Sequence, residues 1–298
     1  VEFIDIAGLV KGANKGEGLG NQFLGQIRQT AAILHVVRCF DDEKINHVES
    51  NIDPIRDIEI IETELLLADI ETIQKQKLKM EKIGEFGKNN EKTILSMLKK
   101  LIDHCSNGRK AKNFAIDEEL IPYKKSLCLL TDKPILYVAN INESNIINQN
   151  KNRHLISIEK YLSQQDRLLS LCFSLEEEIT RLDYKEKLLF LSEYNLSEPG
   201  LNKVIQSSFD LLGLQTFFTC GEKEVRSWTT KKGILAPQAA GIIHTDFERG
   251  FIKADVFHYN EIIKYGKEKT LREIGLIRQE GRNYTVKDGD CILFRFNV

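Results

Sequence analysis

Short apolar runs alternate with longer periodic segments along the first two thirds of the chain. Four runs are rich in β-branched or aliphatic residues, and we interpret them as buried strands: VEFIDI (1–6), AILHVVRCF (32–40), PILYVAN (134–140) and LLSLCF (168–173). Between the first two, residues 20–30 place Phe23, Leu24 and Ile27 on one face, which predicts a helix. Strands that alternate with helices predict a parallel α/β sheet.

Two long helical segments interrupt this alternation after residue 57. Their apolar positions are Ile58, Ile61, Leu65 and Ala68, spaced 3-4-3, and Ile94, Leu98, Leu101 and Cys105, spaced 4-3-4. The sequence GEFG at 84–87 separates them. This pattern predicts two helices that pack as an antiparallel coiled coil inserted into the sheet domain.

The pattern changes again toward the C-terminus. The pattern predicts helices over residues 176–212 with an interruption at 198–200. From residue 214, short alternating strands, a turn centred on Pro237 and a final CILFRF strand predict a small α+β domain. We therefore expect a sheet domain at 1–56 and 131–213, a helical insertion at 57–130 and a C-terminal domain at 214–298.

Composition excludes several classes of protein. The chain is 42% hydrophobic and 29% charged, which fits a globular protein with a core. Its net charge of −2 is too small to attract nucleic acid or membrane by overall electrostatics. Six scattered cysteines without a CxxC pair favour reduced thiols and a cytoplasmic location. The chain opens at Val1 within an apparent strand, from which we interpret it as an N-terminally truncated protein. The pattern does not indicate an oligomeric state.

The segment DIAGLVKGANKGEGLGNQFL holds five glycines between Gly8 and Gly20. The spacing fits neither a dinucleotide fingerprint nor a P-loop, and no G-K-[ST] occurs in the chain. What remains is D-x-x-G from Asp5 to Gly8, the arrangement that serves the γ-phosphate and Mg²⁺ side of P-loop NTPases. By itself this short motif is weak and more often marks an ordinary turn after a strand.

Two further strand ends carry polar residues. Asn140, Ile141, Asn142 and Glu143 follow PILYVAN at the place where GTPases carry N-K-x-D, and Cys172-Phe173-Ser174 ends the next run, where a base-contacting loop is expected. Ligands of parallel sheets bind beyond the carboxyl ends of the strands, so the three strand ends together point to one nucleotide site. Each alone is also compatible with a simple turn.

Several segments together resemble the YchF family of Obg-like ATPases over essentially the whole chain. They are DIAGLVKGANKGEGLGNQFLGQIRQT, HVVRCF, IEIIETELLLADIE, the N-x-x-E motif and PQAAGIIHTDFERGFIKADV. The resemblance implies a P-loop G domain with a coiled-coil insertion and a C-terminal TGS domain of β-grasp type. It also implies ATP as the preferred substrate over GTP, with Mg²⁺ as cofactor, and a place of action at the ribosome.

The resemblance also assigns roles to residues. Gly8 would position the γ-phosphate and Asp5 the water shell of the metal. Leu9 takes the place of a catalytic glutamine, and His47 is the candidate that orients the attacking water. Asn140, Ile141 and Glu143 would hold adenine, with the backbone and the side chain of Ile141 in contact with the ring. The family's P-loop should precede Val1, so we expect this chain alone to be inactive.

A basic stretch leaves a second function open. Residues 75–112 carry eleven Lys or Arg against four Asp or Glu. The candidate contacts for ribosomal RNA are Lys75, Lys77, Lys79, Lys82, Arg109, Lys110 and Lys112. A solubilising helix face explains the same charges. The alternatives to an ATPase are a non-enzymatic RNA- or ribosome-binding adaptor, which the basic stretch favours, and a GTPase.

Overall fold

The computed structural model describes residues 1–6, 19–42, 51–84, 89–147, 152–221 and 224–297. The chain divides into two compact units, Val1–Ile205 and Gln206–Val298, with the division inside helix α9. Gly8, Leu9 and His47 lie outside the described residues. No described helix has the length and apolar character needed to cross a membrane.

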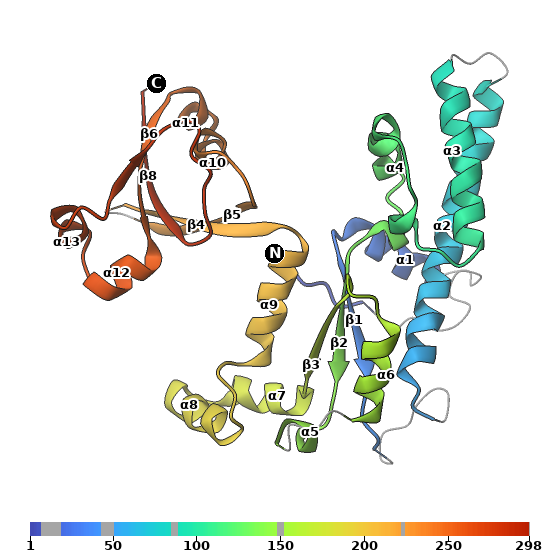
Figure 1. Cartoon of the computed structure of the whole chain (residues 1–298), viewed down its shortest axis with the longest axis horizontal. Helices are drawn as coiled ribbons and strands as arrows, with labels where there is room; N and C mark the ends of the chain where they lie inside the picture. The colour runs from blue at the N-terminus through green and yellow to red at the C-terminus, as the bar shows by residue number, and fades with distance from the viewer. Residues whose placement is uncertain (7–18, 43–50, 85–88, 148–151, 222–223, 298) are drawn as a thin grey trace. The chain divides into compact units, whose positions relative to one another are not determined.

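Unit 1 is built on a three-stranded parallel sheet in the order β1-β2-β3 (Figure 1). Val36 lies opposite Val138, which in turn lies opposite Leu169. Its elements are α1 (Leu19–Gln29), β1 (Ile33–Arg38), α2 (Pro54–Gly84), α3 (Asn89–Ser106), η1 (Ala111–Asn113), η2 (Glu118–Leu120), α4 (Ile121–Ser126), η3 (Leu130–Asp132), β2 (Ile135–Asn140), α5 (Glu143–Ile147), α6 (Arg153–Tyr161), β3 (Arg167–Leu171), α7 (Phe173–Arg181), α8 (Tyr184–Glu193) and the start of α9 (Gly200–Leu211).

The first predicted strand does not form. Residues 1–6 have no regular secondary structure, and the side chains of Phe3 and Ile4 are 53% and 50% exposed. A strand is held by hydrogen bonds from a neighbour, and within the part of the chain that the structure describes no segment pairs with residues 1–6. The apolar sequence VEFIDI therefore predicted a buried strand incorrectly for this structure.

The two long helices form as the periodicity predicts. Asp53 immediately precedes α2, whose first residue is Pro54. The Asp53 carboxylate accepts a hydrogen bond from the Arg56 N–H at 3.2 Å, in keeping with an N-cap followed by proline at the first helical position. Further along, α2 packs on α3 through a core that includes Ile73, Leu98 and Leu101. Figure 1 shows α3 running antiparallel beside the second half of α2.

Helices α2 and α6 cover one face of the sheet. Ile58 of α2 and Ile158 of α6 pack against Val37, Tyr137 and Ala139. Near the other end of the sheet, the buried carboxylate of Asp69 accepts hydrogen bonds from the N–H groups of Leu130 at 2.7 Å and Thr131 at 2.8 Å, and from the Thr131 hydroxyl at 2.7 Å. Burial raises the pKa of Asp69, and these hydrogen bonds act in the opposite direction.

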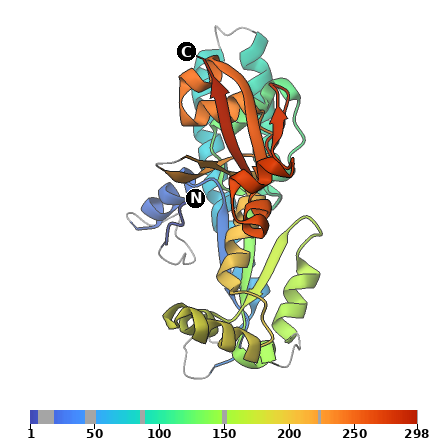
Figure 2. The same cartoon turned by 90° about the vertical axis from the view of Figure 1, so that its left-hand side faces the viewer.

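Unit 2 is an α+β domain with a five-stranded mixed sheet in the order β5-β4-β8-β6-β7 (Figure 2). Its elements are β4 (Leu214–Cys220), β5 (Val225–Lys231), α10 (Ala236–Ile243), α11 (Thr245–Arg249), β6 (Phe251–His258), α12 (Tyr259–Tyr265), α13 (Glu268–Glu273), β7 (Arg278–Glu280) and β8 (Asp290–Phe296). Together with unit 1, this gives the expected fold class of a P-loop NTPase sheet with a helical insertion and a β-grasp-type tail.

Helix α10 replaces the turn that was expected around Pro237. Proline stands in the first turn of this helix, where its missing N–H would have no intrahelical partner. Ala236, Ala239 and Ala240 are fully buried against Phe217 and neighbouring core residues. Their small side chains let the helix backbone approach the sheet closely, and the short alanine-rich run carried too weak a periodic signal to predict it.

Candidate functional site

The predicted base-binding residues meet at the carboxyl ends of β2 and β3. The Asn140 carbonyl accepts from the Cys39 N–H at 2.8 Å, and the Ile141 N–H donates to the Leu171 carbonyl at 2.8 Å. These bonds continue the parallel ladder one residue past the ends of β1 and β2. The backbone that leads into Asn142 and Glu143 is therefore anchored by the sheet.

Asn140 links the two polar strand ends directly. Its side-chain Oδ1 accepts a hydrogen bond from the Phe173 N–H at 3.2 Å. Because the amide oxygen is engaged there, the amide nitrogen is the donor end left for a ligand. The Phe173 ring, at the start of α7, is 38% exposed, and the neighbouring Ser174 side chain contacts the Cys172 sulfur at 3.1 Å. The start of N-x-x-E and the Cys172–Ser174 segment thus lie next to each other at the ends of β2 and β3.

Ile141 does not present its side chain to this site. It is 5% exposed and packs in the core beneath the sheet with Cys39 and Leu155. The alternation of side chains along an extended chain explains this result, since Tyr137, Ala139 and Ile141 all face α2 and α6. The expected contact of the Ile141 side chain with an adenine ring is therefore wrong for this structure. Cys172, at 3% exposed, is buried as well.

Glu143 and Asn142 remain accessible, and Glu143 has a partner that no motif indicated. Both side chains are exposed, and Asn142 Oδ1 accepts from the Ser144 hydroxyl at 3.0 Å. The hydroxyl of Tyr194 donates to Glu143 Oε1 at 2.7 Å. This contact is the main cause that raises the pKa of Tyr194 to about 12. Tyr194 lies 51 residues from Glu143, beyond the reach of any local sequence pattern.

The γ-phosphate side of the predicted site is described only in part. Asp5 has an exposed side chain in the irregular segment 1–6, while Gly8, Leu9 and His47 lie outside the described residues. Across the described ranges, no group of three or more His, Cys, Asp or Glu side chains is arranged to hold a metal ion. A single carboxylate fits the way in which Mg²⁺ is bound in phosphate-transfer sites, mainly by substrate oxygens and water.

The predicted basic contacts divide into two groups. Lys110 is an internal residue, because its ammonium lies 2.6 Å from Glu62 and is 16% exposed. Lys112 pairs with Asp166 at 2.9 Å, Lys75 with Glu71 at 2.5 Å and Lys77 with Glu81 at 3.6 Å. The side chains of Lys79, Lys82 and Arg109 are exposed on and beside the α2–α3 hairpin. These three are the residues best placed for an external anion.

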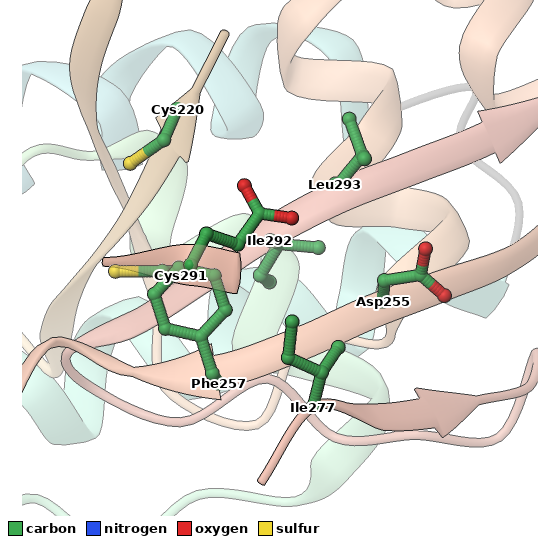
Figure 3. A pocket seen from close by; sticks show the side chains of 8 residues that line it. Cys220, Asp255, Phe257, Ile277, Cys291, Ile292 and Leu293 are labelled. Atoms are coloured by element: carbon green, nitrogen blue, oxygen red, sulfur yellow. The ribbon is translucent and has the colours of Figure 1, made fainter. Parts of the chain in front are cut away.

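A small pocket in unit 2 contains none of the predicted nucleotide-binding residues. It has room for about one water molecule, and Figure 3 shows Cys220 and Cys291 with their sulfurs on the same side of it. Asp255 Oδ2 accepts from the Arg295 guanidinium at 3.0 Å and 3.2 Å. Burial raises the pKa of Cys291 to about 12, which disfavours the reactive thiolate form.

Comparison with known proteins gives consistent matches. The family model YchF-GTPase_C, described as a protein of unknown function (DUF933), matches residues 214–297. A protein of Bacillus subtilis named "Ribosome-binding ATPase YchF" is 46% identical over the whole of this chain, which covers 81% of that relative. The protein of the same name from Escherichia coli O157:H7 is 44% identical, with 82% of its length covered.

Two solved structures share the fold. That of the Schizosaccharomyces pombe YchF GTPase aligns with a TM-score of 0.80 at 36% identity, covering 94% of this chain and 76% of that one. A GTP binding protein from Pyrococcus horikoshii OT3 aligns with a TM-score of 0.54 at 16% identity, over 92% of this chain and 81% of the other, which supports the fold alone.

Proposed function

Since the chain belongs to the YchF family, we propose that it forms the base side and the γ-phosphate side of a P-loop ATPase that acts at the ribosome in the cytoplasm. The observation that carries this proposal is the hydrogen bond from the Phe173 N–H to Asn140 Oδ1, which links the ends of β2 and β3, with Glu143 three residues beyond Asn140. The Asn140 amide nitrogen and the Glu143 carboxylate supply a donor and an acceptor for a purine edge. The exposed Phe173 ring supplies an apolar surface beside them.

The proposed reaction is attack of water on the γ-phosphate. Mg²⁺, when bound, neutralises charge that develops on the phosphate oxygens. In this proposal the Asp5 carboxylate would hold the metal's water shell, the Gly8 N–H would approach a γ-phosphate oxygen, and Leu9 would stand where related enzymes carry a catalytic glutamine. His47 accepts a hydrogen bond from the attacking water and orients it. These assignments rest on the family resemblance.

The test compares this chain with a chimera that adds the part of the Bacillus subtilis relative which this chain does not cover, where the family resemblance places the P-loop. We expect measurable phosphate release from ATP only for the chimera, because the P-loop supplies most of the phosphate positioning. In the chimera, His47→Ala should lower kcat much more than it weakens ATP binding, since water orientation matters in the transition state. Equal activity of the chain alone, or preference of the chimera for GTP, would contradict the proposal.

An RNA-contacting role for the hairpin is a second component of the proposal. Lys79, Lys82 and Arg109 are exposed and could neutralise phosphates of ribosomal RNA without reading its sequence. The triple substitution to Gln should weaken co-sedimentation with ribosomes and make the remaining binding less dependent on salt. Substituting the acid-paired Lys75, Lys77 and Lys112 provides a control with the same change in charge. A chimera that binds ribosomes normally without hydrolysing ATP would favour the adaptor.

A further inference from the structure

The last turn of helix α8 holds Tyr194 in a defined position. The Tyr194 N–H donates to the Phe190 carbonyl at 3.2 Å, and the two rings lie 4.8 Å apart between centroids. The helix starts at a capping box in which Asp183 accepts from the Lys185 and Glu186 N–H groups. The backbone of Tyr194 is thus positioned at the C-terminal end of a helix that is capped at its N-terminus.

Glu143 is fixed from the other side. It is the first residue of α5 and lies three residues beyond Asn140, which is anchored in the sheet ladder and bonded to the Phe173 N–H. Its Oε1 accepts a hydrogen bond from the Tyr194 hydroxyl at 2.7 Å. Because Tyr194 approaches one carboxylate oxygen, the two oxygens of Glu143 are no longer equivalent toward a ligand.

We propose that Tyr194 is a specificity-determining positioning residue, which occupies one oxygen of Glu143 and thereby disfavours guanine relative to adenine. A guanine edge offers two adjacent N–H donors, and a carboxylate binds both best when both of its oxygens are free. Adenine has no such pair of donors: its one exocyclic amino group, N6, lies beside the acceptor N1, and a single free carboxylate oxygen is sufficient to accept from it. The inference rests on the proposed function, because it requires Glu143 to face the base.

The nucleotide test uses the chimera defined above and the variant Tyr194→Phe, which removes the hydroxyl and keeps the ring. The affinities for ATP and GTP are measured separately by competition with a fluorescent nucleotide. We expect the ratio of ATP to GTP affinity to fall roughly two- to tenfold, the range that corresponds to loss of one hydrogen bond. Tyr184→Phe is the matched control, since Tyr184 begins the same helix and is 77% exposed.

A second measurement needs no nucleotide and is made on the chain itself. The phenol of Tyr194 should titrate near pH 12, and Glu143→Gln should return its pKa toward 10, as followed by absorbance after a rapid pH jump. The signal is assigned by its loss in Tyr194→Phe. A phenol that titrates near 10 in the unchanged chain overturns the inference.

The outcomes separate the two proposals. If the chimera prefers ATP and Tyr194→Phe changes both affinities equally, or neither, the role of Tyr194 in base selection is overturned while the ATPase assignment stands. If the unchanged chimera binds neither nucleotide, or prefers GTP, both proposals fail. A fall in the affinity ratio for Tyr194→Phe but not for Tyr184→Phe supports the inference.

Discussion

The hydroxyl of Tyr137 donates to Glu62 Oε1 at 2.7 Å, which joins the central strand of the sheet to helix α2 across 75 positions of sequence. The ammonium of Lys110 reaches the same oxygen at 2.6 Å and the Tyr137 hydroxyl at 3.2 Å. Three segments, β2, α2 and the residue before η1, are therefore held by one carboxylate. Glu62 is 14% exposed, so little water is available to replace either partner.

Removing the Lys110 ammonium should lower the free energy of unfolding more than removing the Tyr137 hydroxyl. Lys110→Met leaves a largely buried carboxylate without its cation, and we expect the free energy of unfolding to fall by about 2–4 kcal/mol. Tyr137→Phe leaves the ion pair intact and should cost about 1 kcal/mol. Urea unfolding at pH 7 measures both, with Lys79→Met at an exposed position as the control. Losses below about 0.5 kcal/mol for Lys110→Met would show that the cluster does not stabilise the fold.

His35 should make stability depend on pH. Burial against the Tyr137 ring, 5.6 Å away between centroids, lowers the pKa of His35 to about 4. The unfolded chain has a histidine pKa near 6.5 and so binds the proton first, which means that stability falls as the pH drops from about 6.5 toward 4. The slope from this one group approaches about 1.4 kcal/mol per pH unit at most.

The measurement is urea unfolding between pH 7 and pH 5. His35→Gln should flatten the decline in stability, whereas His244→Gln, at a position with a 58% exposed side chain, should leave it unchanged. A parallel decline in all three proteins would show that His35 is not responsible.

The thiols should differ sharply in reactivity. Cys128 is exposed, whereas burial raises the pKa of Cys39 to about 12 and that of Cys105 to about 11. In the native protein, a thiol reagent at pH 8 should modify Cys128 first, and Cys39 and Cys105 only after unfolding. Cys128→Ser should remove the fast phase. Rapid modification of Cys105, located by peptide mapping, would contradict the burial described for the α2–α3 core.

The sequence indicated most of the fold through periodicity. Leu98 and Leu101 lie at the predicted helix interface, and the five apolar residues before Asn140 form the buried central strand. The pattern failed where an element depends on a partner elsewhere, as in residues 1–6, which are apolar and yet unpaired across the described ranges. It also failed at Pro237, where a turn signal stands inside the first turn of a helix.

The candidate site was predicted in outline but not in its chemistry. Asn140 and Phe173 were placed at adjacent strand ends, and the structure connects them by a hydrogen bond. Alternation along β2 could have shown that Ile141 faces the core. No sequence rule could have paired Tyr194 with Glu143 or assigned Lys110 to Glu62, because both contacts depend on how distant helices pack.

The length of helix α2 determines how far its C-terminal end moves when its base tilts on the sheet. It runs without interruption from Pro54 to Gly84, so that at about 1.5 Å per residue it is roughly 46 Å long. Its first turns pack on the sheet at Ile58, whereas its second half packs on α3 at Ile73. A helix of this length that tilts by about 5° at the sheet would move by about 4 Å at Gly84.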